Sequence, residues 1–411
     1  ALAELARMGE QGVPEEVFNA YPGERFEFGP TYIIPKPFDP RVLIYESMAV
    51  AKAAMDSGVA RLQIDLDEYR ERLERYLGSS RELMRTVINK AKSSPKRIVF
   101  PEGSEERVLR AVQILTEERI CAPILLGTEA EIRGQASKVG VSLDGVTIVD
   151  HHLSNDRAKY QAELVRLRKR KGVTEQDAER LLGRRSYFGA MMVRTGAADG
   201  LVAGLTKSYA ESILPAFEVV GLAEGHEAAA GVYVVIQKER VLFFADGSVN
   251  IEPSAEELAD IAGLGAETAR WFGFDPVVAV LSSSNYGSVR DERTDRLSKA
   301  VELAKARWKD LVIDGEMQAD IALDPARRAT RFGFSEIKGE ANVLIFPNLE
   351  AAHIATRMIG VIGGATVVGP ILMGMRSPMN SLQRTATVDE IVNLTAITVL
   401  QLPANGTLQL A

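Results

Sequence analysis

The sequence is poor in the residues that build disulfide frameworks, metal clusters and membrane spans. Cys121 is the single cysteine among 411 residues, which excludes an internal disulfide framework and indicates a reducing compartment. The four histidines have no metal-ligand spacing such as H-E-x-x-H. No apolar run reaches the roughly 18 residues of a membrane-spanning helix, and no basic-then-apolar leader opens the chain. We therefore expect a cytoplasmic protein with no membrane partner.

Composition indicates a folded chain with more than one domain. The 46% hydrophobic and 26% charged residues are typical of globular proteins. A length of 411 residues suits two or three domains of about 100–200 residues each. The net charge of −7 argues against nucleic acid as a partner. The chain begins at Ala1, in a helical pattern and without a methionine, so we expect it to be a fragment of a longer protein.

A change of pattern near residue 79 divides the chain into two regions. Residues 1–78 are mainly helical, apart from an extended segment at residues 32–41. That segment holds three prolines in six positions, which deny it both helix and sheet hydrogen bonds, and we expect it to lie as a strap. Residues 42–78 are predicted to be a helical connector. The second region covers residues 79–411.

From residue 79 onward, short apolar runs alternate with longer helical patterns. Because these runs are continuously apolar, they predict parallel strands covered on both faces, and hence an α/β fold. The predicted strands are residues 97–103, 122–127, 146–149, 200–203, 232–236, 241–244, 277–281, 311–313, 343–346 and 366–369. Residues 232–244 are the only predicted antiparallel hairpin.

Four polar loops rich in small residues follow predicted strands. Ligands of open α/β sheets bind beyond the carboxyl ends of strands, where hydroxyl and backbone N–H groups suit phosphate or carboxylate. Ordinary capping and turn chemistry explains single residues of this kind, but several such loops favour a cleft. Asp314, Glu316 and Asp320 are better explained as turn and helix N-terminal carboxylates than as a metal site. The four loops are residues 245–250, 282–288, 314–320 and 369–375.

A basic block, residues 166–171, stands out in an acidic protein. Such a run is usually a solvated helix face. The functional alternative is a docking surface for a polyanionic small molecule, and the block alone leaves both readings open.

Longer motifs in residues 80–411 resemble phosphotransacetylases, and they occur in that family's order, which argues against chance. They are residues 187–193, 198–202, 287–288, 313–320, 340–349, 369–374 and 389–393. The resemblance implies a two-subdomain α/β fold like that of isocitrate and isopropylmalate dehydrogenases, with mainly parallel sheets and a ligand cleft between the subdomains. The first subdomain would hold about residues 80–237 and 380–411, and the second about residues 238–379. The resemblance also implies a homo-oligomer formed through the second subdomain.

The first 78 residues resemble the end of a bacterial malic enzyme, in residues 21–28, 33–41 and 49–60. A malic-enzyme tail followed by a phosphotransacetylase-like module is the layout of hybrid NADP-dependent malic enzymes. In that family the module is understood as an acetyl-CoA sensor that inhibits oxidative decarboxylation of malate to pyruvate. The resemblance thus implies acetyl-CoA as effector and the chain's own N-terminal malic domain as partner. NADP and Mg²⁺ or Mn²⁺ would belong to that missing domain.

Several positions depart from the pattern of active phosphotransacetylases. Their Leu-Ser-Arg is residues 382–384 here, with Gln383 in place of the serine. Their nearby acidic residue falls on Glu390, or on Asp389 if the alignment slips by one. The family's cysteine, arginine and loop histidine positions are Gly247, Leu214 and Lys207. An amide cannot act as an acid or base, and losing an arginine that holds phosphate should remove several kcal/mol of transition-state stabilisation.

The resemblance therefore implies a cleft that keeps its ligand contacts and has lost its chemistry. We expect a regulatory acetyl-CoA-binding module without acetyltransferase activity, and no catalytic or metal-binding residue. Two alternatives stay open, an active phosphate acetyltransferase and a structural oligomerisation module. The predicted acetyl-CoA-binding residues are Arg384, Gln383, Asn380, Ser282, Ser284, Asn285, Lys207, Gly369, Pro370, Met373 and Glu390.

Overall fold

The computed structural model describes residues 33, 35, 39–77, 79–237 and 240–402. The chain divides into two compact units, residues 1–89 and residues 90–411. The helix α5 (Ser79–Lys92) begins right after the predicted division at residue 78 and continues across the boundary between the units. The predictions for residues 1–32 and for most of the proline-rich segment fall outside the described residues.

In the first unit, α3 (Pro40–Asp56) contacts α4 (Leu66–Leu77). Asp39 caps α3, since its buried carboxylate accepts a hydrogen bond from the backbone N–H of Arg41 at 3.0 Å and pairs with the Arg41 guanidinium at 2.7 Å. Pro40 then occupies the first helical position, which needs no backbone donor. The helix therefore starts inside the segment predicted to be extended, because Asp-Pro is also a helix-start signal.

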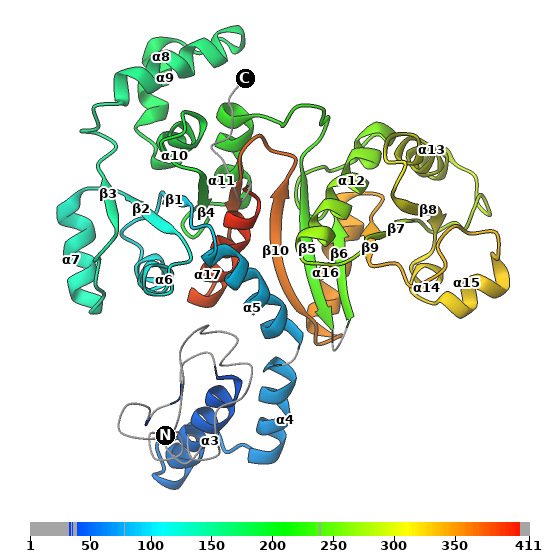
Figure 1. The fold of residues 1–411 in the computed structure, drawn as a ribbon, viewed down its shortest axis with the longest axis horizontal. Helices are drawn as coiled ribbons and strands as arrows, with labels where there is room; N and C mark the ends of the chain where they lie inside the picture. The colour runs from blue at the N-terminus through cyan, green and yellow to red at the C-terminus, as the bar shows by residue number, and fades with distance from the viewer. Residues whose placement is uncertain (1–32, 34, 36–38, 78, 238–239, 403–411) are drawn as a thin grey trace. The chain divides into compact units, whose positions relative to one another are not determined.

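The second unit contains two sheets, seen one beside the other in Figure 1. The first sheet has five strands and is entirely parallel. Its order is β11 (Met379–Ser381), β4 (Gly200–Ala203), β1 (Arg97–Phe100), β2 (Ala122–Leu126) and β3 (Thr147–Val149). Nearly all residues of β1, β2 and β4 are buried, as the continuous apolar runs predict.

The second sheet has six strands and is mixed. Its order is β10 (Thr366–Met373), β5 (Ala230–Gln237), β6 (Arg240–Ala245), β9 (Val343–Ile345), β7 (Val277–Leu281) and β8 (Val312–Met317). The pairs β6–β9, β9–β7 and β7–β8 are parallel, whereas β10–β5 and β5–β6 are antiparallel. The α/β class with mainly parallel sheets is thus confirmed.

Helices cover both sheets. In the first sheet, a buried cluster joins Val99 and Leu126 to Phe188 and Met191 on α10, while α17 contacts β4 and α6. In the second sheet, α12 approaches β9 closely at Gly265, where a Cβ atom would lie 2.9 Å from a Val343 methyl. The helices of this unit are α6 (Glu106–Glu117), α7 (Glu129–Val139), α8 (Arg157–Arg168), α9 (Glu175–Leu182), α10 (Arg185–Arg194), α11 (Tyr209–Pro215), α12 (Ala255–Trp271), α13 (Glu292–Arg307), α14 (Ala319–Ala322), α15 (Pro325–Arg331), α16 (Leu349–Val361) and α17 (Val388–Leu400).

Three details differ from the sequence-based expectation. The segment 369–373 is not a loop, because β10 runs through a bulge between Val368 and Ile371 and pairs with β5. Asn380 lies in a buried strand, β11, that the polar sequence Pro-Met-Asn-Ser did not reveal. The subdomain boundary predicted at 237/238 separates β5 from β6, which the structure pairs in one hairpin.

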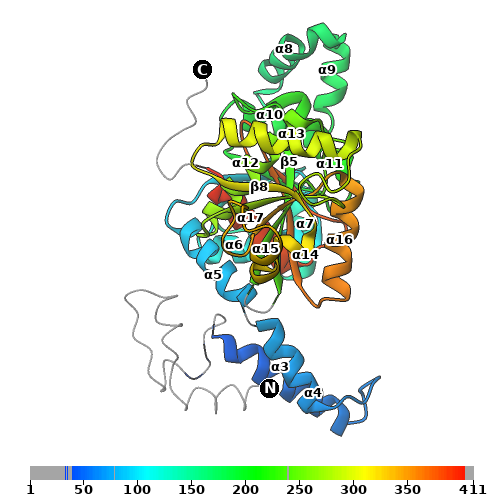
Figure 2. The ribbon, with the colours of Figure 1, turned by 90° about the vertical axis from the view of Figure 1, so that its right-hand side faces the viewer.

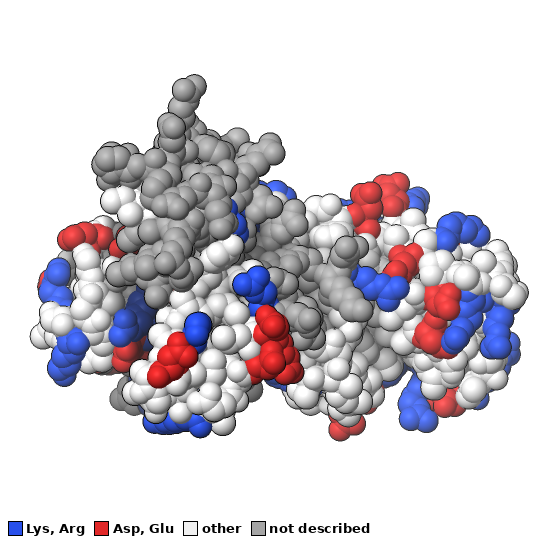
Figure 3. Space-filling model, turned by 90° about the horizontal axis from the view of Figure 1, so that it is seen from below, with Lys and Arg blue, Asp and Glu red and all other residues white. Residues whose placement is uncertain are grey.

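Two further features concern the helices and the charged surface. Within the described part of the chain, no helix is both long and apolar enough to span a membrane. On the face shown in Figure 3, acidic and basic side chains are interspersed over the described surface.

Candidate functional site

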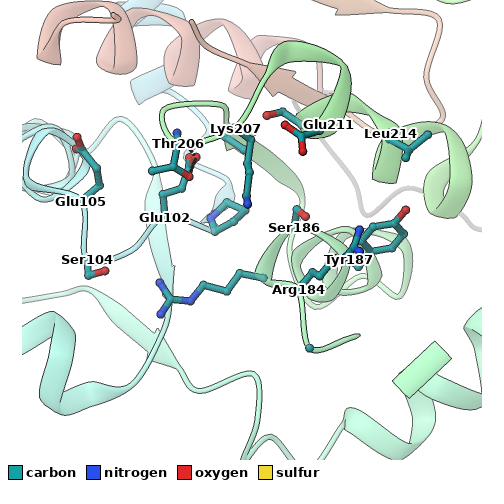
Figure 4. Close-up of a pocket in the computed structure, with 15 residues that line it drawn as sticks. Glu102, Ser104, Glu105, Arg184, Ser186, Tyr187, Thr206, Lys207, Glu211 and Leu214 are labelled. Carbon is teal, nitrogen blue, oxygen red and sulfur yellow. Dashed lines mark hydrogen bonds between the residues drawn. The ribbon is translucent and has the colours of Figure 1, made fainter. Parts of the chain in front are cut away.

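The larger described cavity, about 660 Å³, lies in the first sheet's half of the second unit. It is formed at the carboxyl ends of β1 and β4 and at the start of α10 (Figure 4), which is where parallel sheets place their ligands. All of its lining residues belong to the first predicted subdomain. The lining residues are Pro101, Glu102, Ser104, Glu105, Gly183, Arg184, Arg185, Ser186, Tyr187, Ala203, Thr206, Lys207, Glu211, Ser212 and Leu214.

Glu102 fixes the loop that follows β4. One carboxylate oxygen accepts a hydrogen bond from the backbone N–H of Gly204 at 3.0 Å. The other accepts from both the backbone N–H and the hydroxyl of Thr206, each at 2.8 Å. Charge-assisted bonds of this kind are stronger than neutral ones, so Glu102 holds the segment that carries Lys207 into the cavity (Figure 4).

The segment after β11 is joined to the same loop. The Nε of Arg384 donates to the carbonyl oxygen of Lys207 at 3.2 Å. Arg107, from the start of α6, donates to the carbonyl oxygens of Arg384 and Ala386, both at 2.8 Å. Because β11, β4 and β1 are neighbours in one parallel sheet, their three following loops meet at one edge. The structure thus places Arg384 against the backbone of Lys207, at the edge of the cavity and outside its lining.

Gly204 allows the loops after β4 and β11 to lie close together. Its φ of +115° and its surroundings suit glycine alone, since a Cβ atom would lie 2.3 Å from the carbonyl oxygen of Leu382. The backbone N–H of Leu382 also donates to the carbonyl oxygen of Ala203 at 2.7 Å. The loops after β4 and β11 are therefore in direct backbone contact.

The start of α10 supplies cationic and hydroxyl groups. α10 begins at Arg185 with neither a side-chain cap nor an acidic residue in its first turn. Arg185 pairs with Glu131 at 2.8 Å, and Glu131 also accepts from the hydroxyl of Ser104 at 2.6 Å. The Ser104 hydrogen bond and the Arg185 charge lower the pKa of Glu131. The backbone of Arg184 bonds Leu181, Tyr187 and Phe188, whereas its exposed side chain has no hydrogen bond or ion pair with another described residue.

Part of the lining is apolar. Leu214 is 45% exposed and lines the cavity together with Tyr187. The Tyr187 hydroxyl donates to Glu218, which also pairs with Arg168 at 2.6 Å. Burial and the Glu218 carboxylate raise the pKa of the Tyr187 hydroxyl, so it stays protonated. Of the basic block, Arg168 is therefore engaged by an acidic neighbour.

His151 contacts Gly183, a residue of the cavity lining, and its environment shifts the pKa of its imidazole in one direction. Its Nε2 lies 3.3 Å from the carbonyl oxygen of Gly183 and must donate, which leaves the buried Nδ1 without a partner. Burial, with the nearby charges of His152 and Arg185, lowers the pKa of His151. The unfolded chain then binds this proton more readily, so its contribution to stability is complete above about pH 6.5 and is lost as the pH falls through the lowered folded value.

We expect His151→Gln to weaken the acid dependence of stability. Between about pH 7 and pH 5, the free energy of unfolding of the variant should fall less than that of the wild type. Urea unfolding at both pH values measures this difference. His353→Gln, on the exposed surface of α16, is the control. An unchanged pH dependence in His151→Gln would show that this imidazole is not the titrating group.

The other predicted ligand residues are not among those that line the cavity. Asn380 is buried, accepts from the backbone N–H of Leu372 at 2.8 Å and donates to Thr398 and Gln401, so its amide joins the two sheets. Glu390 caps α17 by accepting from the backbone N–H of Thr387 at 2.7 Å. Gln383 is next to Arg384 and half-buried.

The predicted residues of the second sheet are also engaged within the protein. Ser284 bonds the backbone of Val289, and Asn285 exchanges hydrogen bonds with Gln318, while Ser282 accepts from the backbone N–H of Ser284. Gly369 and Pro370 form the bulge of β10. Met373 lines a separate cavity of about 120 Å³ with His226, Glu267 and Gln401, at the junction of the two sheets.

The carboxylates weighed as a metal site have protein partners. Asp314 accepts from Tyr286 and Ser335, Glu316 from Ser298, and Asp320 pairs with Arg327. Among the described residues there is no group of three or more His, Cys, Asp or Glu side chains placed to hold a metal ion. Cys121 is buried, which raises the pKa of its thiol.

Two of the departures from the family pattern lie on the cavity wall, and a third is explained by packing. Lys207 and Leu214 both line the cavity. Gly247 faces the ring of Tyr233, since a Cβ atom there would lie 2.7 Å from a ring carbon. The tyrosine ring therefore fills the space that a larger residue at position 247 would need.

Sequence reasoning missed the groups at the start of α10. Arg184, Arg185 and Ser186 follow a glycine and lead into the buried part of α10, residues 187–193, and no capping residue stands before them. That combination of a basic pair with an uncapped helix start was the available signal. Glu102 gave none, because its role depends on contacts with residues about a hundred positions away.

The chain is similar to two groups of known proteins. Residues 82–399 match the family model described as phosphate acetyl/butaryl transferase. The chain is 40% identical over 409 residues to the NADP-dependent malic enzyme of Escherichia coli, covering 98% of this chain and 53% of that enzyme. It therefore matches a C-terminal part of these malic enzymes and spans about half their length.

The match to phosphotransacetylases covers less of this chain, but it covers nearly all of each relative. The phosphate acetyltransferase of Bacillus subtilis is 38% identical over 320 residues, which is 78% of this chain and 99% of that protein. The crystal structure of a phosphotransacetylase from Streptococcus pyogenes superposes with a TM-score of 0.76 at 36% identity, covering 79% of this chain and 98% of that one. The chain belongs to the phosphate acetyl/butaryl transferase family.

Proposed function

We propose that the chain is an acetyl-CoA-binding regulatory module of an NADP-dependent malic enzyme. The observation that carries the proposal is the extent of the two likenesses. The malic enzyme of Escherichia coli matches 98% of the chain, whereas the phosphate acetyltransferase of Bacillus subtilis matches 78%. The residues before the transferase-like part therefore have counterparts in the malic enzymes.

The cavity supports binding of a polyanionic thioester. Arg184, Arg185 and Lys207 line it, and Arg384 stands at its rim. Leu214 and Tyr187 provide an apolar wall that suits a pantetheine arm. Acetyl-CoA combines phosphates with such an arm, so one cavity offers groups for both parts.

Loss of transferase chemistry rests on the departures at the matching positions. Gln383 stands where the family has serine, and an amide neither gives nor takes a proton during catalysis. Leu214 contributes no positive charge to the cavity wall, where the transferase pattern has an arginine. Both changes lower the capacity to stabilise a developing oxyanion or bind phosphate.

An active phosphate acetyltransferase is the second candidate. The match to 99% of the Bacillus subtilis enzyme, and the presence of Arg384, favour it. A thiol-release assay separates the two readings. We expect acetyl-CoA to bind without phosphate-dependent release of CoA, and rapid release that is abolished by Arg384→Ala would favour the transferase.

Regulation requires that acetyl-CoA bind the active and inhibited states of the enzyme with different affinity. In a protein that carries the malic enzyme part before this chain, we expect acetyl-CoA to slow NADPH formation from malate. NADP and the divalent metal would bind in that catalytic part. An equal rate with and without saturating acetyl-CoA would contradict the regulatory role.

We also propose that the module self-associates through α16. This helix, along one side of the second unit in Figure 2, exposes Ile354, Met358 and Val361, and the exposed Ile362 directly follows it, with exposed fractions of 54–85% for the four side chains. Their spacing puts them on one helix face. A pure oligomerisation module is the third candidate function, and it would leave the charged cavity without a role.

Breaking this face should lower the mass in solution. We expect the double variant Ile354→Asp, Met358→Asp to sediment as a smaller species than the wild type, because charges on an apolar interface oppose association. Analytical ultracentrifugation measures the change. Glu292→Lys, at the exposed start of α13, serves as the control, and an unchanged mass in the aspartate variant would exclude α16 from the interface.

A further inference from the structure

We propose that Tyr209 and Ser248 form a clasp that holds the two sheets of the second unit in one relative orientation. The part that carries the first sheet is named the first half, and the part that carries the second sheet is named the second half. The two hydroxyl oxygens lie 2.9 Å apart and share a hydrogen bond across the halves. Neither residue lines the 660 Å³ cavity, so the clasp is separate from the proposed acetyl-CoA contacts.

The chain crosses between the halves twice, and the two crossing segments are bonded to each other. Residues 221–229 lead from the first half into β5, and residues 374–378 lead from β10 back to β11. The backbone N–H of Ala223 donates to the carbonyl oxygen of Gly374 at 2.9 Å, which joins the two segments. Two adjacent connections of this kind form a hinge, and other contacts between the halves fix its angle.

The buried amides that join the sheets belong to this hinge. Asn380 and Gln401 bond the backbone of Leu372, which stands just before the second crossing segment. The hydrogen bond between Tyr209 and Ser248 instead connects α11, which follows β4, to the loop that follows β6. It therefore joins a loop beyond one sheet to a helix beyond the other.

Ser248 is held in position by its own half. The buried carboxylate of Asp246 accepts from the backbone N–H groups of Ser248 at 2.9 Å and Asn250 at 2.6 Å. It also accepts from the backbone N–H of Gly231, the second residue of β5, at 2.8 Å. A Cβ atom at Gly231 would lie 1.7 Å from the Ser248 hydroxyl oxygen, so glycine makes the room that this side chain occupies.

Tyr209 is presented from the first half in an equally fixed position. It is the first residue of α11, whose start is set by the reciprocal capping box of Ser208 and Glu211. Its ring packs against the buried cluster that contains Phe188. Burial raises the pKa of the Tyr209 hydroxyl, so it stays protonated and can donate. Because both partners are held in place separately, their hydrogen bond costs little conformational entropy.

The clasp also concerns the cavity, because α11 takes part in both. Glu211, Ser212 and Leu214 of this helix line the cavity (Figure 4), whereas Tyr209 at its start reaches the second half. A turn of the second half that releases Ser248 therefore frees one end of a cavity-lining helix. The clasp in this way couples the relative orientation of the sheets to the shape of the cavity wall.

A cysteine placed between the halves reports their separation. Ala229 is 2% exposed and belongs to the same buried cluster as Phe188, while its chain leads into β5. In an Ala229→Cys background, the new thiol reacts with iodoacetamide when the halves open. The chain's own Cys121 is buried directly before β2 and reports global unfolding of the same molecule. Peptide mass spectrometry of the whole 411-residue chain measures both labelling rates.

In this background we expect Tyr209→Phe and Ser248→Ala each to raise the labelling rate at position 229 about fivefold, the factor that suits a neutral hydrogen bond. The rate follows the population of the open form, even where that population is small. The double variant should match each single variant, because all three lack the same bond. Tyr286→Phe is the matched control, since it removes a tyrosine hydroxyl bond to Asp314 within the second half, and it should leave the rate unchanged.

Unchanged labelling at position 229 in both clasp variants would overturn the proposal. Equal acceleration at position 229 and at Cys121 would also overturn it, because the bond would then contribute only to global stability. If circular dichroism shows that the Ala229→Cys background does not fold, Val249→Cys is the second reporter, since Val249 packs against the same cluster from the loop after β6. The measurement uses no ligand, so its outcome is independent of whether acetyl-CoA binds.

Discussion

Replacing Gly204 with alanine is expected to destabilise the second unit by about 3 kcal/mol or more, because backbone strain at positive φ and steric overlap add. A methyl group at this position would lie 2.3 Å from the carbonyl oxygen of Leu382. Neither atom can move away by rotating a side chain, because the backbone fixes the positions of both. Relief would require the loops after β4 and β11 to separate. Chemical unfolding, followed by circular dichroism, measures the loss.

The matched control is Gly196→Ala. Gly196 also has a positive φ, +76°, but no atom lies within 4 Å of a Cβ built there. Its substitution should therefore cost only about 1 kcal/mol, from backbone strain alone. Equal losses in the two variants would show that the close approach between Gly204 and Leu382 does not matter for stability. The Gly204 variant should also bind acetyl-CoA more weakly, since Lys207 and Arg384 depend on the same contact.

Arg384→Ala should weaken acetyl-CoA binding about tenfold or more. Removing a charge-assisted contact typically costs roughly 1.5–3 kcal/mol. Arg384 is exposed, and its Nε donates to the carbonyl oxygen of Lys207, which leaves the guanidinium at the cavity rim. Titration calorimetry of wild type and variant measures the effect, with Arg384→Lys as an intermediate.

The competing explanation is a surface role for Arg384. Pairing with Asp389 or Glu390 on α17 would be worth less than about 1 kcal/mol and would leave ligand binding unchanged. Within the described residues, Arg384 forms no ion pair with either, and the Glu390 carboxylate accepts from the backbone N–H of Thr387. Equal acetyl-CoA affinities in wild type and Arg384→Ala would nevertheless remove Arg384 from the site.

The sequence was informative about strands and less so about the site. Buried parallel strands such as β1, β2 and β4 are continuous apolar runs, so their pattern identifies them without tertiary information. β11 was missed because three residues with a buried asparagine carry no strand pattern, and that amide is satisfied only by Leu372, Thr398 and Gln401 from other elements.

The site was predicted only in part, because it too depends on contacts between distant parts of the chain. Polar loops were expected to gather at the strand ends, but the pattern does not tell which sheet forms the larger cavity. Ser284 bonds Val289 within its own loop, and Asn285 joins that loop to Gln318 after β8. Lys207 was identified through its departure from the family pattern. Arg184 was not, because neither its place in the cavity lining nor the contacts of its side chain can be read from the sequence.

The most direct test of the central claim is calorimetric titration of acetyl-CoA into the 411-residue chain, with free thiol monitored in the same cell in the presence of phosphate. We predict saturable binding at one site per chain with no enzymatic release of CoA, and binding that weakens about tenfold in Arg384→Ala. Absence of binding, or phosphate-dependent release of CoA at an enzymatic rate, would contradict the account.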